Sequence, residues 1–124
     1  MTEPALTAEA VRAYCLGLNG SYEDTPFPRN PDLTVFKVGG RIFAFCALAE
    51  TPLKLSLKCD PEEALRLRAA HDAITPGRHL NKRHWNTITA PELPPRMVRE
   101  LIEDSYDLVV AGLPRTERLR LDRP

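Results

Sequence analysis

One stretch decides the fold: residues 34–48 read TVFKVGGRIFAFCAL. β-Branched and aromatic residues flank the pair Gly39-Gly40, and two glycines between such runs are the signal of a two-residue hairpin turn. The register that this turn sets places Phe36 opposite Phe43. We therefore expect an antiparallel hairpin with Phe36, Phe43 and Phe45 in one aromatic cluster on a single face.

Strand and helix patterns continue on both sides of this hairpin. Leucine alternates with lysine and serine over residues 53–58, which predicts a third antiparallel strand with one face in the core and one in water. Ahead of the hairpin, apolar residues at helical spacing follow Thr7, a good N-cap, and predict a short helix that ends near Gly17. Residues 19–33 are rich in Pro, Asn, Asp and Gly, so we expect a long connection with room for a brief strand at residues 21–23.

The second half of the chain predicts two more helices. Residues 60–63 read DPEE, which combines an N-cap acid, proline at the first helical position and glutamate at the third, so a helix should run to about His71. Residues 75–77 should form a turn, and residues 80–90 contain enough Trp, Thr and Ile for one or two short strands. From Pro95, apolar residues recur at helical spacing and predict a long amphipathic helix that ends at Gly112.

These elements predict an α+β fold, a two-layer sandwich in which an antiparallel sheet carries helices on one face, in the order α-β(3)-α-β(2)-α. A chain of 124 residues has the size of one domain, and no linker or repeat divides it. We expect a single domain over residues 1–124. Its core should span about residues 6–113, and residues 114–124 should form a tail that is either a last turn of helix or a mobile end.

Composition and cysteine usage narrow the cellular setting. Hydrophobic residues make up 43% of the chain and charged residues 27%, which is typical of a folded globular protein. No apolar stretch reaches the length of about 18 residues that a membrane span needs, and the first four residues do not begin a secretory signal. Because Cys15, Cys46 and Cys59 form no Cys-x-x-Cys pair, we expect three free, buried thiols and a cytoplasmic location.

The charge is balanced overall, so any argument for a polyanionic partner must be local. The chain has 17 basic and 17 acidic residues, yet residues 74–91 contain basic side chains and no carboxylate. Arginine and lysine neutralise phosphates, histidine adds charge below about pH 6.5, and an exposed indole stacks on a base. The candidate nucleic-acid-binding residues are therefore Arg78, His79, Lys82, Arg83, His84 and Trp85, with Lys54 and Lys58 from the solvent face of the third strand.

A purely structural role for the same segment stays open. Trp85 would then belong to the core, and the side chains of Asn81 and Asn86 would satisfy turns. The basic residues would solvate a strand edge and so oppose aggregation.

The sequence offers no catalytic, metal or cofactor site. The histidines and cysteines lack the close pairs that zinc needs, and the sequence alone shows no base placed to activate a cysteine. The pair Gly39-Gly40 lies in a hairpin rather than before a helix, so it does not form a phosphate-binding loop. Four acids of the last helix are spaced like a solvated face, with a hard cation as the minor alternative: Glu100, Glu103, Asp104 and Asp107. We expect no enzyme activity and no cofactor.

The chain resembles the bacterial MmcQ/YjbR-like proteins over roughly residues 6–116. The resemblance is carried by the motifs TPF, VFKVGGRIFA, LSLKCDP, PGRHLNKRHWNT and SYDLV, at residues 25–27, 35–44, 55–61, 76–87 and 105–109. It implies a compact α+β fold likened to frataxin and to type III secretion chaperones, and DNA binding through a proposed double-wing motif. It brings no established catalytic residues.

Two functions follow from these observations. The first is a non-enzymatic DNA-binding protein that contacts phosphates through the local basic segment. The alternative is a chaperone-like protein-interaction or adaptor module, which would use an exposed apolar patch or a sheet edge and have no nucleic-acid role. The expected partner is therefore either DNA or another protein.

Overall fold

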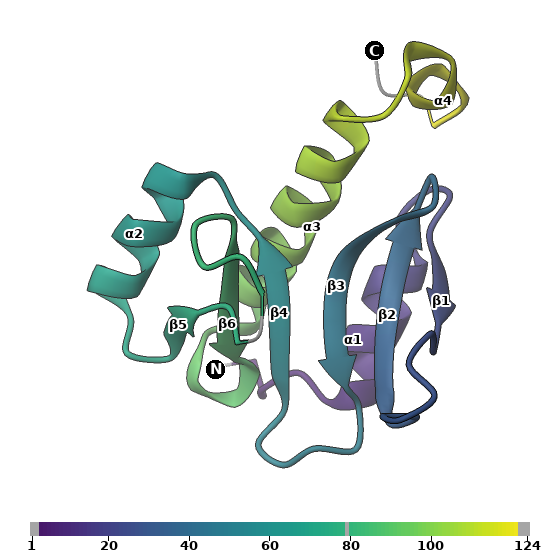
Figure 1. Cartoon of the computed structure of the whole chain (residues 1–124). Coiled ribbons are helices and arrows are strands. Elements are labelled where there is room, and N and C mark those ends of the chain that lie inside the picture. Colours follow the sequence, from purple (N-terminus) through teal and green to yellow (C-terminus); the bar gives the residue numbers. More distant parts are fainter. Residues whose placement is uncertain (1–2, 79, 122–124) are drawn as a thin grey trace.

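The sheet has six antiparallel strands in the spatial order β1-β2-β3-β4-β6-β5. The computed structural model describes residues 3–78 and 80–121. Helices α1 and α3 cover one face of the sheet, and α2 lies beside its β5 edge (Figure 1). This arrangement confirms the predicted two-layer α+β fold. The elements in chain order are α1 (Ala8–Leu16), β1 (Tyr22–Asp24), β2 (Leu33–Val38), β3 (Arg41–Ala47), β4 (Lys54–Lys58), α2 (Pro61–Ala70), β5 (Ile74–Pro76), β6 (Trp85–Thr89), the 3-10 helix η1 (Ala90–Glu92), α3 (Pro95–Ala111) and α4 (Arg115–Arg120).

Two short strands change the predicted order. β1 pairs with β2, so four strands rather than three precede α2. β5 occupies residues where the sequence predicts a turn, because Ile74 is buried and pairs with Ile88 of β6. Pro76 is tolerated there since β5 is an edge strand. The observed order is therefore α-β(4)-α-β(2)-α, followed by the short helix α4.

A bulge shifts the register of the hairpin. Phe36 pairs with Ala44 rather than with Phe43, which is the extra residue between two ladder positions. Phe43 turns into the core, where its ring centroid lies 6.5 Å from that of Phe36 and 5.5 Å from that of Tyr106. Phe45 lies on the opposite face of the sheet. The predicted cluster of three phenylalanines is wrong because the alternation of faces does not survive an inserted residue.

Two helices begin at the predicted caps. The Thr7 hydroxyl accepts a hydrogen bond from the amide of Ala10 at 3.1 Å, and the Asp60 carboxylate accepts from the amides of Glu62 and Glu63 at 3.1 and 3.3 Å. No helix in the described part of the chain has the length and apolar character that crossing a membrane requires. The long helix α3 buries Val98, Ile102, Ser105, Tyr106, Val109 and Val110 against the sheet.

A buried hydroxyl joins α3 to two strands. Ser105 Oγ donates to the carbonyl of Phe43 at 2.6 Å and accepts from the amide of Lys58 at 2.8 Å. The β3–β4 ladder ends at the pair Ala44 and Leu57, so the hydroxyl takes the place of the next main-chain bond. This contact holds the end of β4 against α3.

Candidate nucleic-acid interface

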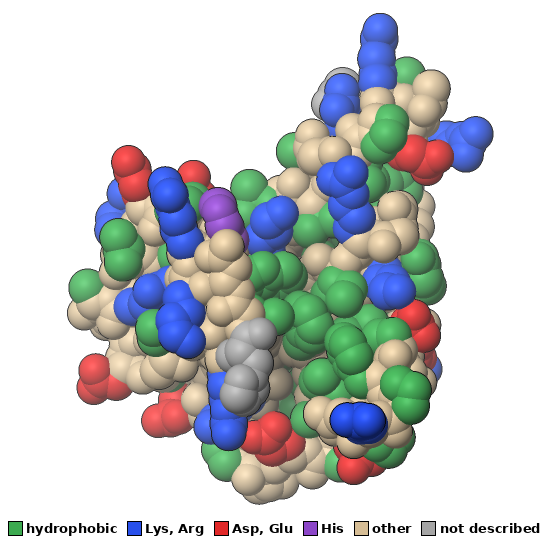
Figure 2. All heavy atoms as spheres, viewed as in Figure 1, with side chains coloured by type: hydrophobic (Ala, Val, Ile, Leu, Met, Phe, Trp, Pro, Cys, Tyr) green, Lys and Arg blue, Asp and Glu red, His purple; other side chains and the backbone are tan. Residues whose placement is uncertain are grey.

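The face of the sheet that α1 and α3 leave uncovered is hollowed. Figure 2 shows hydrophobic side chains gathered at the centre of this face, with Lys and Arg side chains around them. The depression has a volume of about 720 Å³, within the range of ligand-binding clefts. We call it the open hollow, and the lining residues that matter here are Phe27, Arg29, Phe45, Lys54, Arg78 and Leu80.

Two aromatic rings meet on the open face. Phe45 of β3 and Trp85 of β6 have ring centroids 5.3 Å apart and ring planes at 73°, an edge-to-face contact. Both side chains are half-buried, and Trp85 is not part of the buried core. The alternative that places Trp85 in the core is therefore wrong. Its indole is partly accessible on the same face as the open hollow.

Three cations come from the same face as this aromatic pair. Alternation along β4 buries its leucines on the helix side and turns Lys54 and Lys58 to the open face, where Lys58 lies opposite Trp85 in the β4–β6 ladder. Arg78 comes from the β5–β6 connection, and its amide donates to the Thr87 hydroxyl at 3.3 Å. We call Lys54, Lys58 and Arg78 the open-face cations.

The open-face cations have no carboxylate partner within residues 3–78 and 80–121. Lys37, a fourth cation of the sheet, differs because its ammonium lies 2.9 Å from the Asp24 carboxylate. The hydrogen bond from this ammonium lowers the pKa of the Asp24 carboxyl. Among the residues that the structure describes, Glu50 is the one carboxylate that lines the open hollow. The excess of cations makes this face suitable for an anion.

The rest of the predicted basic segment lies at the tip of the β5–β6 connection. Lys82 and Arg83 are exposed and do not line the open hollow. Arg68 of α2 holds this tip by a hydrogen bond to the Lys82 carbonyl, and the His84 carbonyl extends the β4–β6 ladder. His79 lies outside the described residues. The structure therefore gathers the open-face cations and the indole, and leaves the two tip cations at the margin.

Two asparagines of this segment have structural roles, as one reading of the sequence predicted. Asn81 Oδ1 accepts a hydrogen bond from the amide of Arg83 at 3.0 Å. Asn86 Oδ1 accepts from Arg68 Nε at 2.7 Å, and its amide group donates to the Ala64 carbonyl at 3.4 Å. The Asn81 bond satisfies a turn, as that reading predicted, whereas the Asn86 bonds join β6 to α2.

Sequence reasoning missed two residues of the open hollow. Phe27 and Arg29 come from the β1–β2 connection and line its rim, with Phe27 37% exposed. Periodicity cannot place a loop side chain relative to a sheet, so no pattern pointed to them. The available signal was the motif at residues 25–27, which the family resemblance includes.

The acidic residues of α3 have different partners. Glu100 pairs with Arg96 at 3.0 Å, and Glu103 accepts a hydrogen bond from the Tyr14 hydroxyl at 2.9 Å. Asp104 lines a separate cavity between α2 and α3. In the part of the chain that the structure describes, no three His, Cys, Asp or Glu side chains are grouped as a metal ion would need.

The three cysteines are free thiols, as predicted. Burial raises the pKa of Cys15 and Cys46 to about 12. Cys59 is only half-buried, contrary to expectation, and burial together with nearby carboxylates raises its pKa to about 11. Thiols with such pKa values are protonated at neutral pH and are poor nucleophiles.

Comparison with known proteins identifies relatives in bacteria. A family model described as YjbR matches residues 16–108. Uncharacterized protein YbdF of Escherichia coli O157:H7 is 34% identical over 107 residues, which cover 86% of this chain and 88% of the relative. Uncharacterized protein YjbR of Escherichia coli strain K12 is 32% identical over 114 residues, 91% of this chain and 95% of the relative.

Solved structures share the fold over most or all of the chain. The crystal structure of the Deinococcus radiodurans protein DR2400, described with the domain DUF419, is similar with a TM-score of 0.88 and 40% identity, covering 100% of this chain and 94% of that one. A Pseudomonas syringae protein is similar with a TM-score of 0.73 and 25% identity, covering 83% of this chain and 98% of its own.

Proposed function

Because the chain belongs to the YjbR family, we propose that it is a non-enzymatic DNA-binding protein that contacts DNA through the open hollow and the open-face cations. One observation carries the proposal: cations without a carboxylate partner among the described residues lie on the same uncovered sheet face as the Phe45–Trp85 pair. Lysine and arginine neutralise phosphates, and aromatic faces stack on bases. One surface therefore supplies both contacts that a nucleotide needs. The three free thiols support a reducing, cytoplasmic setting.

The shape of the surface favours single-stranded DNA over a duplex. The centre of the open hollow is apolar and recessed, so unstacked bases can enter it while phosphates stay at the cationic rim. The bases of a duplex are stacked inside the double helix and cannot reach a recess in a sheet. A stacking platform within a basic groove is the usual solution for binding a single strand without strict sequence preference.

The number of cations limits the affinity. Arg29, the open-face cations and the tip residues Lys82 and Arg83 give at most six phosphate contacts. For a single strand the logarithm of the binding constant falls by about 0.7 per contact with the logarithm of salt concentration, so we expect a slope of about −4. Binding should therefore be moderate and strongly weakened by salt.

The test measures binding of a fluorescein-labelled oligothymidine and of a duplex of equal length by fluorescence anisotropy at several NaCl concentrations. The single strand should bind more tightly and should quench the emission of Trp85, the sole tryptophan. A triple variant, Lys54→Gln, Lys58→Gln and Arg78→Gln, should flatten the salt slope by about 2. Trp85→Leu should weaken binding about tenfold through lost stacking.

The matched control removes the same charge elsewhere. Arg66, Arg96 and Arg120 are exposed helix residues, each paired with a glutamate three or four positions away in its own helix. Their joint replacement by glutamine should leave affinity and slope nearly unchanged. Equal effects of the two triple variants would mean that overall charge, not this surface, attracts DNA. Absence of binding to either oligonucleotide at low salt would refute the proposal.

One observation favours the alternative, a protein-interaction or adaptor module. Phe27 and Leu80 line the open hollow beside Phe45, and α1 and α3 leave this apolar surface uncovered. An apolar peptide segment seated there would stay bound at high salt, whereas DNA would be released. Selection from a displayed peptide library in high salt, followed by competition with oligothymidine, separates the two functions. Phe45→Ser should abolish capture of any peptide selected for this surface.

A further inference from the structure

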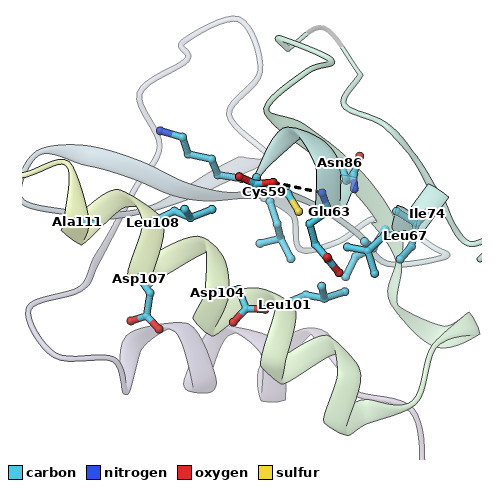
Figure 3. A pocket seen from close by; sticks show the side chains of 14 residues that line it. Cys59, Glu63, Leu67, Ile74, Asn86, Leu101, Asp104, Asp107, Leu108 and Ala111 are labelled. Carbon is cyan, nitrogen blue, oxygen red and sulfur yellow. Dashed lines mark hydrogen bonds between the residues drawn. The ribbon is translucent and has the colours of Figure 1, made fainter. Parts of the chain in front are cut away.

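A second cavity lies on the helix side of the sheet, between α2 and α3 (Figure 3). Its volume is about 350 Å³, enough for a small organic ligand. The walls are mainly apolar and come from four elements that are distant in the chain: Leu57 of β4, Leu67 of α2, Ile74 of β5, and Leu101 and Leu108 of α3. A cavity of this kind takes the apolar part of a ligand.

Carboxylates line the mouth of this cavity. Asp60 and Glu63 come from the start of α2, and Asp104 and Asp107 come from α3. Figure 3 shows the Glu63 side chain reaching from α2 toward α3. Glu63 also pairs with Arg66 on the outer surface of α2, while no ion pair of Asp60 or Asp104 occurs among the described residues.

Nearby carboxylates raise the pKa of two groups that line the cavity, Asp104 and Cys59. The pKa of the Asp104 carboxyl is raised by partial burial and then by four neighbouring carboxylates, and no cation offsets them. The pKa of the Cys59 thiol is raised by burial and then by Glu63, Asp60 and Asp104, with only a weaker opposing effect of Arg68. The guanidinium of Arg68 is already engaged with Asn86 and the β5–β6 connection. Lys58 also lines the cavity, but among the described residues the four lining carboxylates, Asp60, Glu63, Asp104 and Asp107, outnumber it.

A metal ion does not suit this arrangement. Within residues 3–78 and 80–121, no three acidic, histidine or cysteine side chains converge as ligands, and most of the cavity wall is apolar. Hard cations need several oxygen ligands around one point. A cation with an apolar body matches both the wall and the charge.

We propose that this cavity binds a small organic cation, with a short alkyl or single-ring body against the leucines and an ammonium group at the Asp104 and Glu63 carboxylates. Asp104 remains in contact with water, so the ammonium stays partly hydrated while the body is desolvated. A neutral analogue loses the charge attraction, and a carboxylate analogue is repelled. The site lies on the opposite side of the sheet from the open hollow, and its occupancy requires no DNA, although Lys58 lines this cavity and is also an open-face cation.

The test compares three probes with the same chain length: hexylammonium, hexan-1-ol and hexanoate. Each is titrated into the ¹⁵N-labelled full-length protein at low salt and followed by amide chemical shifts. Hexylammonium should shift amides around the cavity, at Cys59, Leu67, Leu101 and Leu108. It should bind about three- to fivefold more tightly than hexan-1-ol, the size expected of a partly exposed ion pair, and hexanoate should bind most weakly. High salt should remove the preference.

Variants locate the charge and the body of the ligand. Asp104→Asn should reduce hexylammonium affinity to that of hexan-1-ol, whereas Glu62→Gln, which removes an exposed carboxylate of α2 that does not line the cavity, should leave the preference intact. Ala111→Leu adds volume at the cavity wall and should weaken both probes. Equal affinity for hexylammonium and hexanoate in the wild type would overturn the proposal, as would shifts confined to other surfaces. The comparison of hexylammonium with hexanoate uses the wild-type protein, so it does not depend on whether any variant folds.

Discussion

Replacing Ser105 by alanine should reveal how far one hydroxyl holds α3 and the sheet together. The change removes a 2.6 Å bond to the Phe43 carbonyl and a 2.8 Å bond from the Lys58 amide. Each main-chain group left without a hydrogen-bond partner lowers the free energy of unfolding by about 1–3 kcal/mol. The smaller value applies to the Lys58 amide, because that contact is only partly buried. We therefore expect the free energy of unfolding to fall by about 3 kcal/mol, or roughly 10 °C in Tm for a domain of this size.

Urea denaturation, followed by the fluorescence of Trp85 and by far-UV circular dichroism, measures this loss. The midpoint should decrease while the m-value stays constant, because the surface exposed on unfolding is unchanged. Ser56→Ala is the matched control. It removes the same atom from a half-buried serine whose hydroxyl shares a hydrogen bond with the Thr87 hydroxyl at 2.9 Å, and it should cost at most about 1 kcal/mol.

The reasoning fails if Ser105→Ala costs no more than Ser56→Ala. Such a result would mean that β3 and β4 close up and form the missing main-chain bond directly, with no need for the hydroxyl. A large decrease in the free energy of unfolding together with a changed m-value would indicate instead an altered denatured state or an intermediate.

Three further outcomes can be measured on the same protein. Gly77→Ala would place a Cβ 2.7 Å from Trp85 Cβ and 2.9 Å from its carbonyl oxygen, so we expect a loss of about 2 kcal/mol in urea titrations and weaker binding of oligothymidine. Iodoacetamide should modify Cys59 before the two buried thiols, at a rate that rises about tenfold per pH unit toward its pKa of about 11; mass spectrometry of peptides checks the order. The pKa of the Asp104 carboxyl is raised in the folded state, so the native protein binds this proton more tightly than the unfolded chain does. The stability that protonated Asp104 contributes is therefore lost as the pH rises above 3.8, the ordinary pKa of the group. Asp104→Asn should remove that loss in urea titrations across pH.

Local patterns predicted most of the fold. The Gly39-Gly40 turn, the Asp60 cap and the 3.6-residue spacing of α3 depend only on residues near one another in the chain, and all three form as expected. The errors arose where distant partners decide the outcome. Ile74 belongs to a strand because Ile88 pairs with it, and the Phe43 bulge forms where α3 fills the core behind it.

The candidate site shows the same division. Alternation along β4 was enough to place Lys54 and Lys58 on one solvent-facing side. Nothing in the chain order indicated that Phe45 would join Trp85, or that Phe27 and Arg29 would complete the open hollow.

Sequence alone thus determined the helices, most strands and the identity of the cations, because helix caps, turns and period-2 patterns act over a few residues. Only the tertiary structure decided which cations share a surface, which face Phe45 takes and that carboxylates of α2 and α3 meet around one cavity. Those outcomes depend on packing between segments dozens of residues apart, and a one-residue bulge is enough to reverse the face that a side chain takes.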